Sequence, residues 1–430
     1  MSSPTMLRAR IEEILLAMER QNQVLRDLEK RLSDARRDLN ATLDPMARLP
    51  LEISSDIFVR CLPDSPRPHK REAPILFLNI CRIWRHIAIS TPSLWTSIAL
   101  RHSNPISLEL WLGRAKTLPL SIHGYLSPSA GFAVKQHARH IKDLELGLTQ
   151  LTRMVEPLVA FSLLAKLVVQ ESDKQASHRE FLEILRAAPA LVECEFMPRI
   201  WNAESRSLAG TLLTHSSLRR LRLGGWSKPS SRNASCMLKY LTLPALEALK
   251  LGDMDLPTTE LASFFTRSSP PLQSLSISGL SDHNLDESLR LVPSISDLGL
   301  TFTDSEVDPF VILKDSVFAP PEQGFLPNLA KIHIHASFSF DVDYNSVINA
   351  LAARRAVTHA PLESFEFSSK NPKPRSDTIA AFRHLAKDSG LRIKVGTHMA
   401  NYICDCEGVP IPPCSLCDPD SYARWQARRS

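Results

Sequence analysis

Glycine and cysteine are scarce in this 430-residue chain, with 14 glycines and 8 cysteines, and the common catalytic motifs are absent. The sequence has no G-x-x-x-x-G-K-[ST] or G-x-G-x-x-G loop of the kind that binds phosphate groups. It also has no G-x-S-x-G nucleophile turn and no zinc-binding H-E-x-x-H pair. A nucleophile, a base and an orienting group cannot be assembled from the motifs that are present. We therefore expect a protein that is not an enzyme.

Long hydrophobic runs and a strong net charge are lacking as well. The longest apolar run covers 13 residues, 157–169, and includes Lys166, whereas a membrane-spanning helix needs about 20. Arg8, Arg10 and Glu12 interrupt the N-terminal segment, where a signal peptide would be apolar. The formal charge of +5 is small and the basic residues are spread along the chain, unlike the clustered Lys and Arg of a nucleic-acid-binding face. The sequence thus predicts neither a membrane nor a nucleic acid as partner.

Half of the cysteines fall in one short segment near the C-terminal end. So few cysteines form no disulfide framework, and a reducing cytoplasmic and/or nuclear location fits best. Cys404, Cys406, Cys414 and Cys417 have the spacing C-x-C-x7-C-x2-C, and four thiolates can hold a tetrahedral zinc ion. The alternative is a tail, residues 401–430, whose cysteines stay reduced in a capping turn or are redox-labile. Apart from zinc at this site, the sequence predicts no cofactor.

The first 44 residues carry a heptad pattern. Apolar residues recur with alternating spacings of four and three, with charged residues between them. The seam positions are Leu7, Ile11, Ile14, Met18, Gln21, Leu25, Leu28, Leu32, Ala35 and Leu39. No glycine or proline interrupts the pattern before Pro45 ends it.

A narrow apolar stripe of this kind is typical of a coiled-coil seam. We therefore predict a coiled-coil helix over residues 1–44, with residues 6–43 pairing with a second copy of the chain or with a partner helix. Gln21 at a seam position costs stability but can set register or partner number. The alternative is a long amphipathic helix that folds back on its own chain or is only partly ordered.

Residues 45–100 show two further apolar stripes at helical spacing. Pro50 suits the first turn of a helix, where its missing N–H is not needed, and Glu52 lies near the positive end of the helix dipole. The first stripe is Ile53, Ile57, Phe58, Cys61 and Leu62, and the second is Leu76, Ile80, Ile83, Trp84 and Ile87. A segment this short buries too small a fraction of its surface to be stable alone. Part of its apolar surface should therefore meet the rest of the chain or another protein.

The same segment resembles an F-box of the form common in large fungal F-box families. The resemblance rests on the L-P-x-E opening at residues 49–52, the C-R-x-W-R element at 81–85 and the P-x-L-W element at 92–95. The family usually has a short link between its first two helices, whereas residues 63–73 insert a polar, proline-rich loop here. The alternative is an ordinary helical hairpin at the edge of a larger domain.

The resemblance implies a small all-α F-box module that docks on a Skp-type adaptor. The adaptor belongs to cullin–RING ubiquitin ligases of the SCF type. The residues that the resemblance assigns to this interface are Leu49, Pro50, Ile53, Ile57, Phe58, Leu62, Ile80, Trp84 and Ile87. The last three would partly pack the module and partly meet the adaptor.

From about residue 101 to 400 the pattern apolar-x-x-apolar-x-apolar recurs at intervals of 23 to 34 residues. The copies begin at Ile141, Leu164, Leu191, Leu218, Leu246, Leu272, Ile295, Leu329, Leu362 and Leu391, the last in shortened form. Such periods are typical of leucine-rich repeats, in which each copy contributes a strand and a helical or irregular arm. The apolar residues bury one core layer per copy, so no copy is stable alone.

We therefore expect an α/β fold, a curved leucine-rich-repeat solenoid with parallel strands on its concave side. Segments such as 179–186 and 346–354 have helical periodicity and should form the convex side. The alternative is a set of unrelated strand–helix units in an ordinary α/β domain.

Binding specificity in such a solenoid should lie at the outward-facing strand positions of the concave side. One such position per copy gives Glu145, Val168, Glu195, Arg222, Lys250, Ser276, Gly299, His333, Glu366 and Lys394. These residues include both signs of charge and no aromatic side chain, which indicates a protein target bound by polar and charged contacts. The candidate contacts are Glu145, Glu195, Arg222, Lys250, His333 and Glu366. For any one of them, a solvated strand face is the simpler explanation.

Together these features predict a coiled-coil helix (1–44), an F-box module (45–100), a leucine-rich-repeat solenoid (101–400) and a Cys-rich tail (401–430). The resemblance implies the substrate-recognition subunit of an SCF-type cullin–RING E3 ubiquitin ligase. The F-box would dock on the adaptor and cullin complex, and the repeats would hold a target protein. The alternative is a non-catalytic leucine-rich-repeat scaffold that acts outside the ubiquitin ligase, including a structural homodimer built on residues 6–43.

Overall fold

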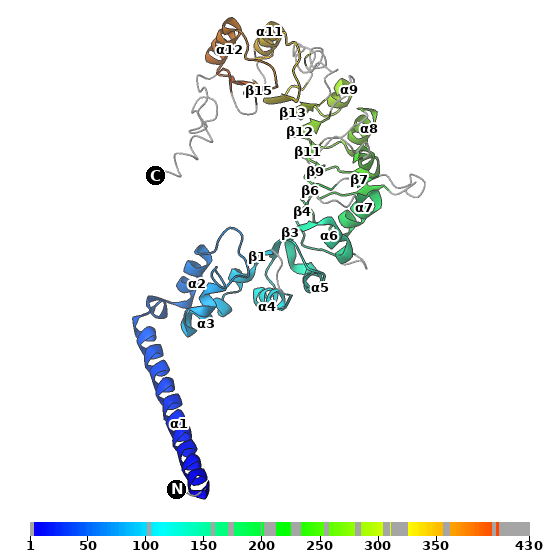
Figure 1. Ribbon diagram of the computed structural model, residues 1–430. Coiled ribbons are helices and arrows are strands. Elements are labelled where there is room, and N and C mark those ends of the chain that lie inside the picture. Colours follow the sequence, from blue (N-terminus) through cyan, green and yellow to red (C-terminus); the bar gives the residue numbers. More distant parts are fainter. Residues whose placement is uncertain are drawn as a thin grey trace. The chain divides into compact units, whose positions relative to one another are not determined.

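The computed structural model divides into two compact units, Met1–Leu118 and Pro119–Ser430. The residues that it describes are 4–100, 105–155, 160–170, 176–198, 200–201, 212–224, 234–252, 258–279, 285–303, 310, 326–355, 362–397 and 401–403 (Figure 1). Cys404, Cys406, Cys414 and Cys417 lie outside the described residues, and so does the zinc site predicted for them.

The first unit begins with the long helix α1 (Pro4–Leu43), which confirms the predicted N-terminal helix. It ends just before Pro45, where the short 3-10 helix η1 (Pro45–Arg48) follows. The eight large apolar side chains of the heptad seam are each between 51% and 57% exposed. Within the described chain, this seam therefore has no cover.

The rest of the first unit is built from short helices and one strand. They are α2 (Leu51–Arg60), η2 (Leu76–Asn79), α3 (Arg82–Ser90), η3 (Pro92–Trp95), β1 (Ser97–Leu100) and α4 (Pro105–Ala115). Their core is aromatic: the ring centroid of Phe58 lies 4.2 Å from that of Phe77 and 4.9 Å from that of Trp84. A second cluster joins Trp95 to Trp111, whose ring centroids are 5.1 Å apart in an edge-on arrangement. Packing of this kind adds to the stabilisation from burial alone.

The loop that contains the 63–73 insertion forms turns and bends between α2 and η2 rather than a helix. The carbonyl oxygen of Pro66 accepts a hydrogen bond of 2.7 Å from the N–H of Ala99. Pro66, Ala73 and Pro74 are buried. The insertion is therefore packed onto the body of this unit.

The second unit contains a long, open sheet of parallel strands, which confirms the predicted α/β class and the parallel pairing. The sheet order within this unit is β2-β3-β4-β6-β9-β11-β12-β13-β14-β15-β16. Their bounds are Leu120–Gly124, Ile141–Gly147, Lys166–Gln170, Glu193–Phe196, Arg220–Leu223, Ala248–Leu251, Ser274–Ser278, Asp297–Phe302, Lys331–Ala336, Ser364–Ser368 and Arg392–Gly396. Four two-residue strands pair separately: β5 (Ala176–Ser177) with β7 (Ile200–Trp201), and β8 (Leu213–Thr214) with β10 (Leu241–Thr242).

The strands of the long sheet stack in the register that the repeat pattern predicts. The second apolar residue of each copy pairs with that of the next, through Leu144, Leu167, Cys194, Leu221, Leu249, Leu275, Leu298, Ile332, Phe365 and Ile393. All of these side chains are buried. Each copy therefore contributes one layer to a continuous core.

Strand β2 was not predicted from the pattern, although it pairs in parallel with β3. Ile122 pairs with Leu144 and occupies the middle apolar position. The buried Leu120 pairs with Ile141 and occupies the first apolar position, but a register shift between Leu120 and Ser121 places it two residues before Ile122 instead of three. The third position falls on Gly124, which has no apolar side chain. A strand can thus join the ladder with only part of the pattern when its neighbour supplies the pairing.

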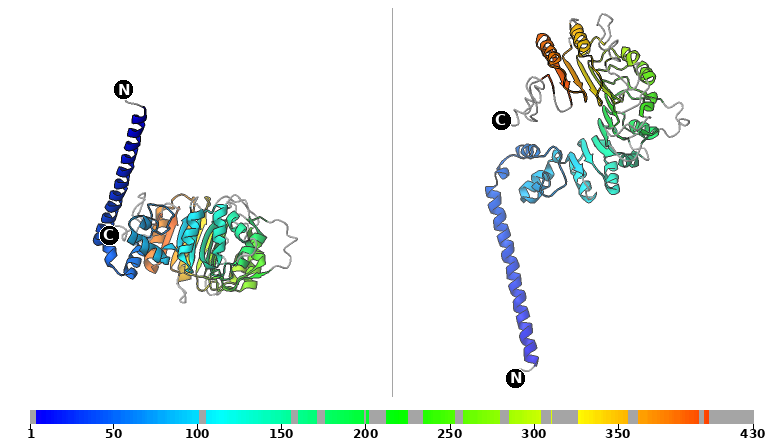
Figure 2. Two further views of the ribbon diagram at one scale, coloured as in Figure 1. Left: turned by 90° about the horizontal axis from the view of Figure 1, so that it is seen from below. Right: turned by 45° about the horizontal axis from the view of Figure 1, so that its top comes forward.

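Helices cover the outer side of this unit, and the strands line its inner side (Figures 1 and 2). The described helices are α5 (Pro128–Gln136), η4 (Ala138–His140), α6 (Leu148–Val155), α7 (His178–Ala187), η5 (Ala234–Tyr240), α8 (Thr258–Ser268), α9 (Leu285–Arg290), α11 (Tyr344–Arg355) and α12 (Ser376–Ser389). Arginine side chains donate hydrogen bonds to backbone carbonyl groups in the segments that connect the strands of the long sheet. Arg267 donates to the carbonyl oxygens of Leu238 and Leu241, and the buried Arg354 donates to that of Leu326.

Among the described helices, none combines the length and the apolar composition needed to cross a membrane.

Candidate functional site

The inner face of the long sheet carries the residues predicted to bind a target. Glu145, Val168, Glu195, Arg222, Lys250, Ser276, Gly299, His333, Glu366 and Lys394 form one unbroken register row across ten neighbouring strands. The six candidate contacts all belong to this row. Their side chains stand on the face opposite the buried apolar residues, because successive side chains of a strand point to opposite faces.

A second polar row runs beside the first and was not predicted. It is two residues earlier in each strand and contains Asp143, Lys166, Glu193, Arg220, Ala248, Ser274, Asp297, Lys331, Ser364 and Arg392. The signal was present in the sequence, since this position also lies between two apolar residues of each copy. The two rows together make the polar surface of the inner face.

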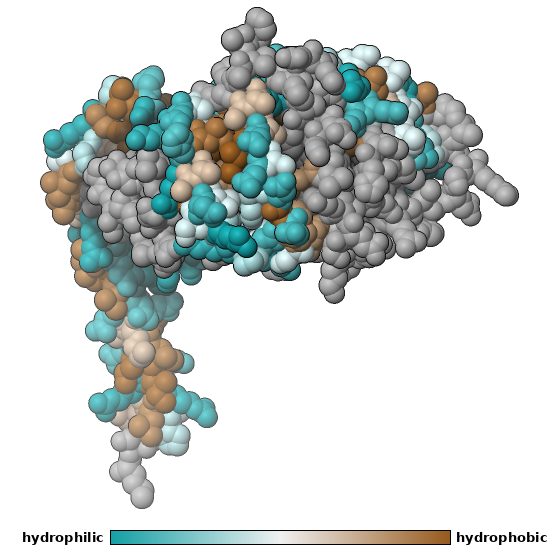
Figure 3. All heavy atoms as spheres, turned by 90° about the horizontal axis from the view of Figure 1, so that it is seen from above, coloured by the Kyte–Doolittle hydropathy of each residue, from teal (hydrophilic) through white to brown (hydrophobic). Residues whose placement is uncertain are grey.

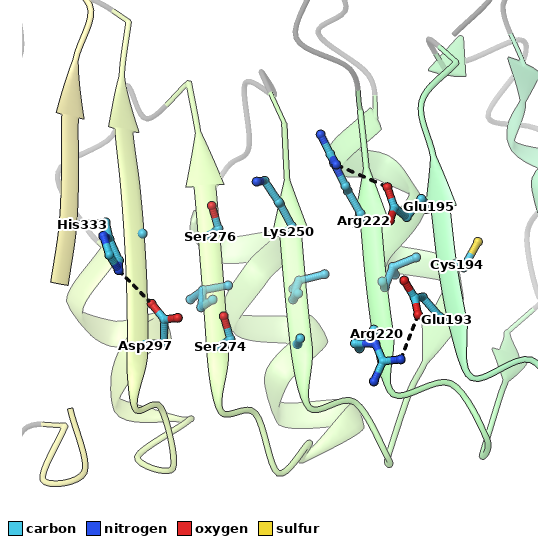
Figure 4. Close-up of a pocket in the computed structure, with 15 residues that line it drawn as sticks. Glu193, Cys194, Glu195, Arg220, Arg222, Lys250, Ser274, Ser276, Asp297 and His333 are labelled. Carbon is cyan, nitrogen blue, oxygen red and sulfur yellow. Dashed lines mark hydrogen bonds and ion pairs between the residues drawn. The ribbon is translucent and has the colours of Figure 1, made fainter. Parts of the chain in front are cut away.

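A pocket of about 500 Å³ opens on this face between β6 and β14. Its floor holds the small residues Ala248, Ser274, Ser276 and Gly299, and charged side chains stand on both sides of them (Figure 4). A Cβ atom at Gly299 would lie 3.2 Å from the Oγ atom of Ser276. The glycine therefore leaves room for the serine hydroxyl on the neighbouring strand. We call this feature the inner-face pocket.

One side of the inner-face pocket is lined by ion pairs. Glu193 lies between Lys166, whose Nζ is 3.0 Å from its carboxylate, and Arg220, whose Nη2 is 2.8 Å away. Burial alone would raise the pKa of Glu193, but the hydrogen bonds from Arg220 and Lys166 outweigh it and hold the pKa below its ordinary value. In the other row, the guanidinium of Arg222 lies 3.3 Å from the carboxylate of Glu195.

Lys250 follows Arg222 in the same row and adds positive charge to this side. Burial, and next the charge of Arg222, lower the pKa of the Lys250 ammonium group. Two cationic side chains next to each other attract a carboxylate or another hydrogen-bond acceptor on a ligand.

The opposite side of the pocket is formed around His333. Its Nδ1 lies 3.3 Å from the carboxylate of Glu366, and its Nε2 lies 3.7 Å from that of Asp297. Lys394 also forms an ion pair with Glu366. The hydrogen bond with Glu366 raises the pKa of His333 despite burial. The hydrogen bond from His333, with help from Lys394, lowers the pKa of Glu366 to about 2.

This arrangement can bind a polar ligand. Both signs of charge stand on each side of an uncharged floor, so a ligand with polar groups of both signs would be matched. Among the described residues, no group of three or more His, Cys, Asp or Glu side chains is placed to hold a metal ion.

The residues assigned to an adaptor interface divide into two groups in the first unit. Leu49, Ile53, Ile57 and Ile80 are between 36% and 51% exposed, and Pro50 is exposed too. Phe58 and Ile87 are buried in the aromatic core, and Leu62 and Trp84 are half-buried.

Helical spacing explains the division. In α2, Ile53 and Ile57 are one turn apart on the exposed side, whereas Ser54 and Phe58 are one turn apart on the buried side. Leu51 and Leu76 are also exposed but were not among the assigned residues. Exposed apolar residues of this chain are brown in Figure 3. We call Leu49, Pro50, Ile53, Ile57 and Ile80 the apolar face of the first unit.

A scan against models of protein families and a search of curated proteins found no match to this chain.

We predict that Glu366→Gln lowers the pKa of His333, because the substitution removes the carboxylate that stabilises the imidazolium. In the wild type, this pair is fully charged between the pKa of Glu366, about 2, and the raised pKa of His333. Its stabilisation is therefore lost as the pH rises through the pKa of His333, and also as it falls through that of Glu366. The measurement is an NMR titration of the histidine ring, assigned with a His333→Gln variant.

Glu363→Gln is the matched control, since it removes an exposed carboxylate just before the same strand. It should leave the His333 titration unchanged. Equal titration curves in the wild type and in Glu366→Gln would show that this ion pair does not form.

Proposed function

We propose that this chain is the substrate receptor of an SCF-type cullin–RING ubiquitin ligase. The first unit would dock on a Skp-type adaptor, and the inner face of the second unit would bind a target protein. The observation that carries the proposal is the apolar face of the first unit, whose aliphatic residues stay exposed above a completed aromatic core.

The chemistry of this face supports a protein partner. Full burial of an aliphatic side chain of this size contributes about 1.5–3 kcal/mol. Ile53 and Ile57 on α2, with Leu49 before it and Ile80 before α3, forgo much of that contribution in the isolated chain. Exposed apolar residues that gather on one side of an element, as Ile53 and Ile57 do on α2, mark an interaction site. They are also among the residues that the resemblance to an F-box assigns to an adaptor interface.

The buried residues among those assigned to the adaptor interface pack the core on which the apolar face rests. Phe58 stacks on Phe77 and contacts Trp84, while Ile87 and Ala88 fill the core behind them. Phe58 and Ile87 would thus contribute to docking by holding α2 and α3 in place and not by direct contact. Leu49 and Ile53 are exposed beside the 63–73 insertion, which is packed onto the unit through Pro66 and Ala73.

The second unit supplies what a receptor needs on the target side. Its inner face presents charged side chains of both signs in two register rows, and the inner-face pocket interrupts them with small residues. Such a surface fits a polar peptide segment of a folded or unfolded protein. The chain would contribute proximity, since holding a target near a ligase raises the effective concentration of its lysines.

We predict that Leu49→Ala combined with Pro50→Ala, and separately Ile53→Asp, abolish co-purification of a Skp-type adaptor with the chain. A residue central to an interface contributes about 2 kcal/mol or more, so the affinity should fall at least about 30-fold. The measurement is a pull-down from cells that co-express the adaptor, followed by titration calorimetry.

The control is Ile89→Asp, which places the same charge on a 44% exposed isoleucine of α3 outside the apolar face. Ile89→Asp should bind the adaptor as the wild type does. If the folded Leu49→Ala, Pro50→Ala variant keeps the adaptor, the ligase assignment fails and a scaffold outside the ubiquitin ligase replaces it.

We predict that Ser276→Arg removes target proteins from the complex but keeps the adaptor. The arginine side chain would occupy the inner-face pocket beside Arg222 and Lys250, where it repels a cationic ligand group and blocks any ligand. The measurement is quantitative mass spectrometry of proteins that co-purify with each variant.

Gln136→Arg on the exposed side of α5 is the matched control, because it adds the same side chain away from the sheet. Proteins lost from Ser276→Arg and retained by Gln136→Arg are the expected targets. Identical protein sets from both variants would exclude the pocket as the binding site.

A further inference from the structure

Helix α1 carries an apolar seam that no described part of the chain covers. Its large seam side chains are more than half exposed, from Leu7 at one end to Leu39 at the other. At a rise of about 1.5 Å per residue, the seam is about 48 Å long. The stripe is narrow, which matches another helix better than the broad face of a sheet or a globular core. Figure 3 shows apolar side chains alternating with hydrophilic ones along this helix.

We propose that α1 pairs with α1 of a second copy of this chain in an antiparallel coiled coil. The proposal does not depend on the adaptor or the target. In heptad terms, Ile11, Met18, Leu25, Leu32 and Leu39 occupy the a positions, and Leu7, Ile14, Gln21, Leu28 and Ala35 occupy the d positions.

The seam is complementary to itself when reversed. In an antiparallel pair, each a residue packs against a d residue of the partner. One register uses all ten positions at once and pairs Leu7 with Leu39, Ile11 with Ala35, Ile14 with Leu32, Met18 with Leu28, and Gln21 with Leu25. The small Ala35 then lies opposite the large Ile11. The two Gln21 side chains fall in adjacent layers beside the symmetry axis, where their amides can hydrogen-bond to each other.

The flanking residues favour the same direction. In this register Val24, a 57% exposed residue beside the seam, meets Val24 of the partner subunit on the symmetry axis. A parallel pair would instead put Val24 against the partner's Glu29, and Leu15 against the partner's Arg10. In the antiparallel register Leu15 faces the partner's Glu29, so the pair of Val24 residues is the apolar flanking contact that this direction gains.

Charges at the flanking positions also disfavour the parallel pair. There, Arg31 would face the partner's Arg36 twice, and none of the flanking pairs would be attractive. In the antiparallel register, Arg10 faces the partner's Asp38 at both ends. Arg8 near the partner's Arg36 offsets this attraction. The flanking charges therefore contribute little to the stability of the antiparallel pair, whereas they destabilise the parallel pair.

The end of α1 is firmly joined to the rest of the first unit. The Asp44 carboxylate accepts hydrogen bonds from the Met46 N–H at 2.9 Å and the Trp84 indole N–H at 2.8 Å. Arg48 donates to the carbonyl oxygen of Thr42 at 2.9 Å. An antiparallel pair would hold the two ends at Leu43 about 60 Å apart along the coil. On the proposed function, both copies of the apolar face could then bind an adaptor at the same time.

The test is the mass of the full chain by light scattering and analytical ultracentrifugation. The wild type should have twice the 48.1 kDa of one chain. Leu25→Asp, at a seam residue that is 55% exposed, should dissociate at least about 100-fold more readily, because a carboxylate would be buried against Gln21 of the partner subunit. Leu16→Asp is the matched control: the residue is 57% exposed but lies on the opposite side of the helix. It should remain a dimer.

Charge reversal tests the direction. Arg10→Asp should weaken the dimer because it would face the partner's Asp38, and Arg10→Asp combined with Asp38→Arg should restore it. In a parallel pair these two residues never meet, so the double variant would give no rescue. A wild-type monomer, equal effects of Leu25→Asp and Leu16→Asp, or an absence of rescue would each overturn the proposal. The melting temperature of each variant shows whether the rest of the chain stays folded.

Discussion

The in-register stacking of parallel strands is the constraint on which the second unit depends. Each strand places its middle apolar residue next to that of the following strand, from Leu144 to Ile393, and a shift by one residue would turn every apolar side chain to the inner face. The backbone continues the ladder before each strand, where the N–H of Glu247 bonds the carbonyl of Arg219 and the N–H of Gln273 bonds that of Glu247. Because the register is fixed, the polar residues between the apolar ones also lie next to their counterparts on the neighbouring strands and form rows across the sheet. The inner-face pocket forms where four of these positions hold small residues.

The sequence predicted most of this unit because the pattern and the physical constraint have the same period. The middle residues of all ten copies are paired and buried, and the row from Glu145 to Lys394 is continuous. Two features were missed for physical reasons. Strand β2 obtains its place from pairing with β3, although Leu120 and Ile122 are two residues apart where the pattern has three, and Gly124 stands at the third apolar position. The pocket depends on which residues of neighbouring strands lie side by side, and spacing along one strand does not contain that information.

The first unit shows what an apolar pattern along the sequence does not predict. An apolar stripe at helical spacing predicts a helix but does not say which of its residues face the core. Phe58 and Ile57 are consecutive members of one stripe, yet the first is buried against Phe77 and the second is exposed. Only the packing of α2 on η2 and α3 separates core from surface. The same packing gives Asp44 its indole partner, Trp84, and thereby joins α1 to this core.

In the proposed function, the first unit docks on the adaptor and the second unit binds the target. Hydrogen–deuterium exchange of the full chain with and without a purified Skp-type adaptor examines this division without any substitution. The proposed function predicts that the adaptor slows the exchange of backbone amides in residues 49–62 and 76–87 and leaves exchange in the strands between 141 and 396 unchanged. Unchanged exchange in residues 49–62, or protection only in the strands, would contradict it.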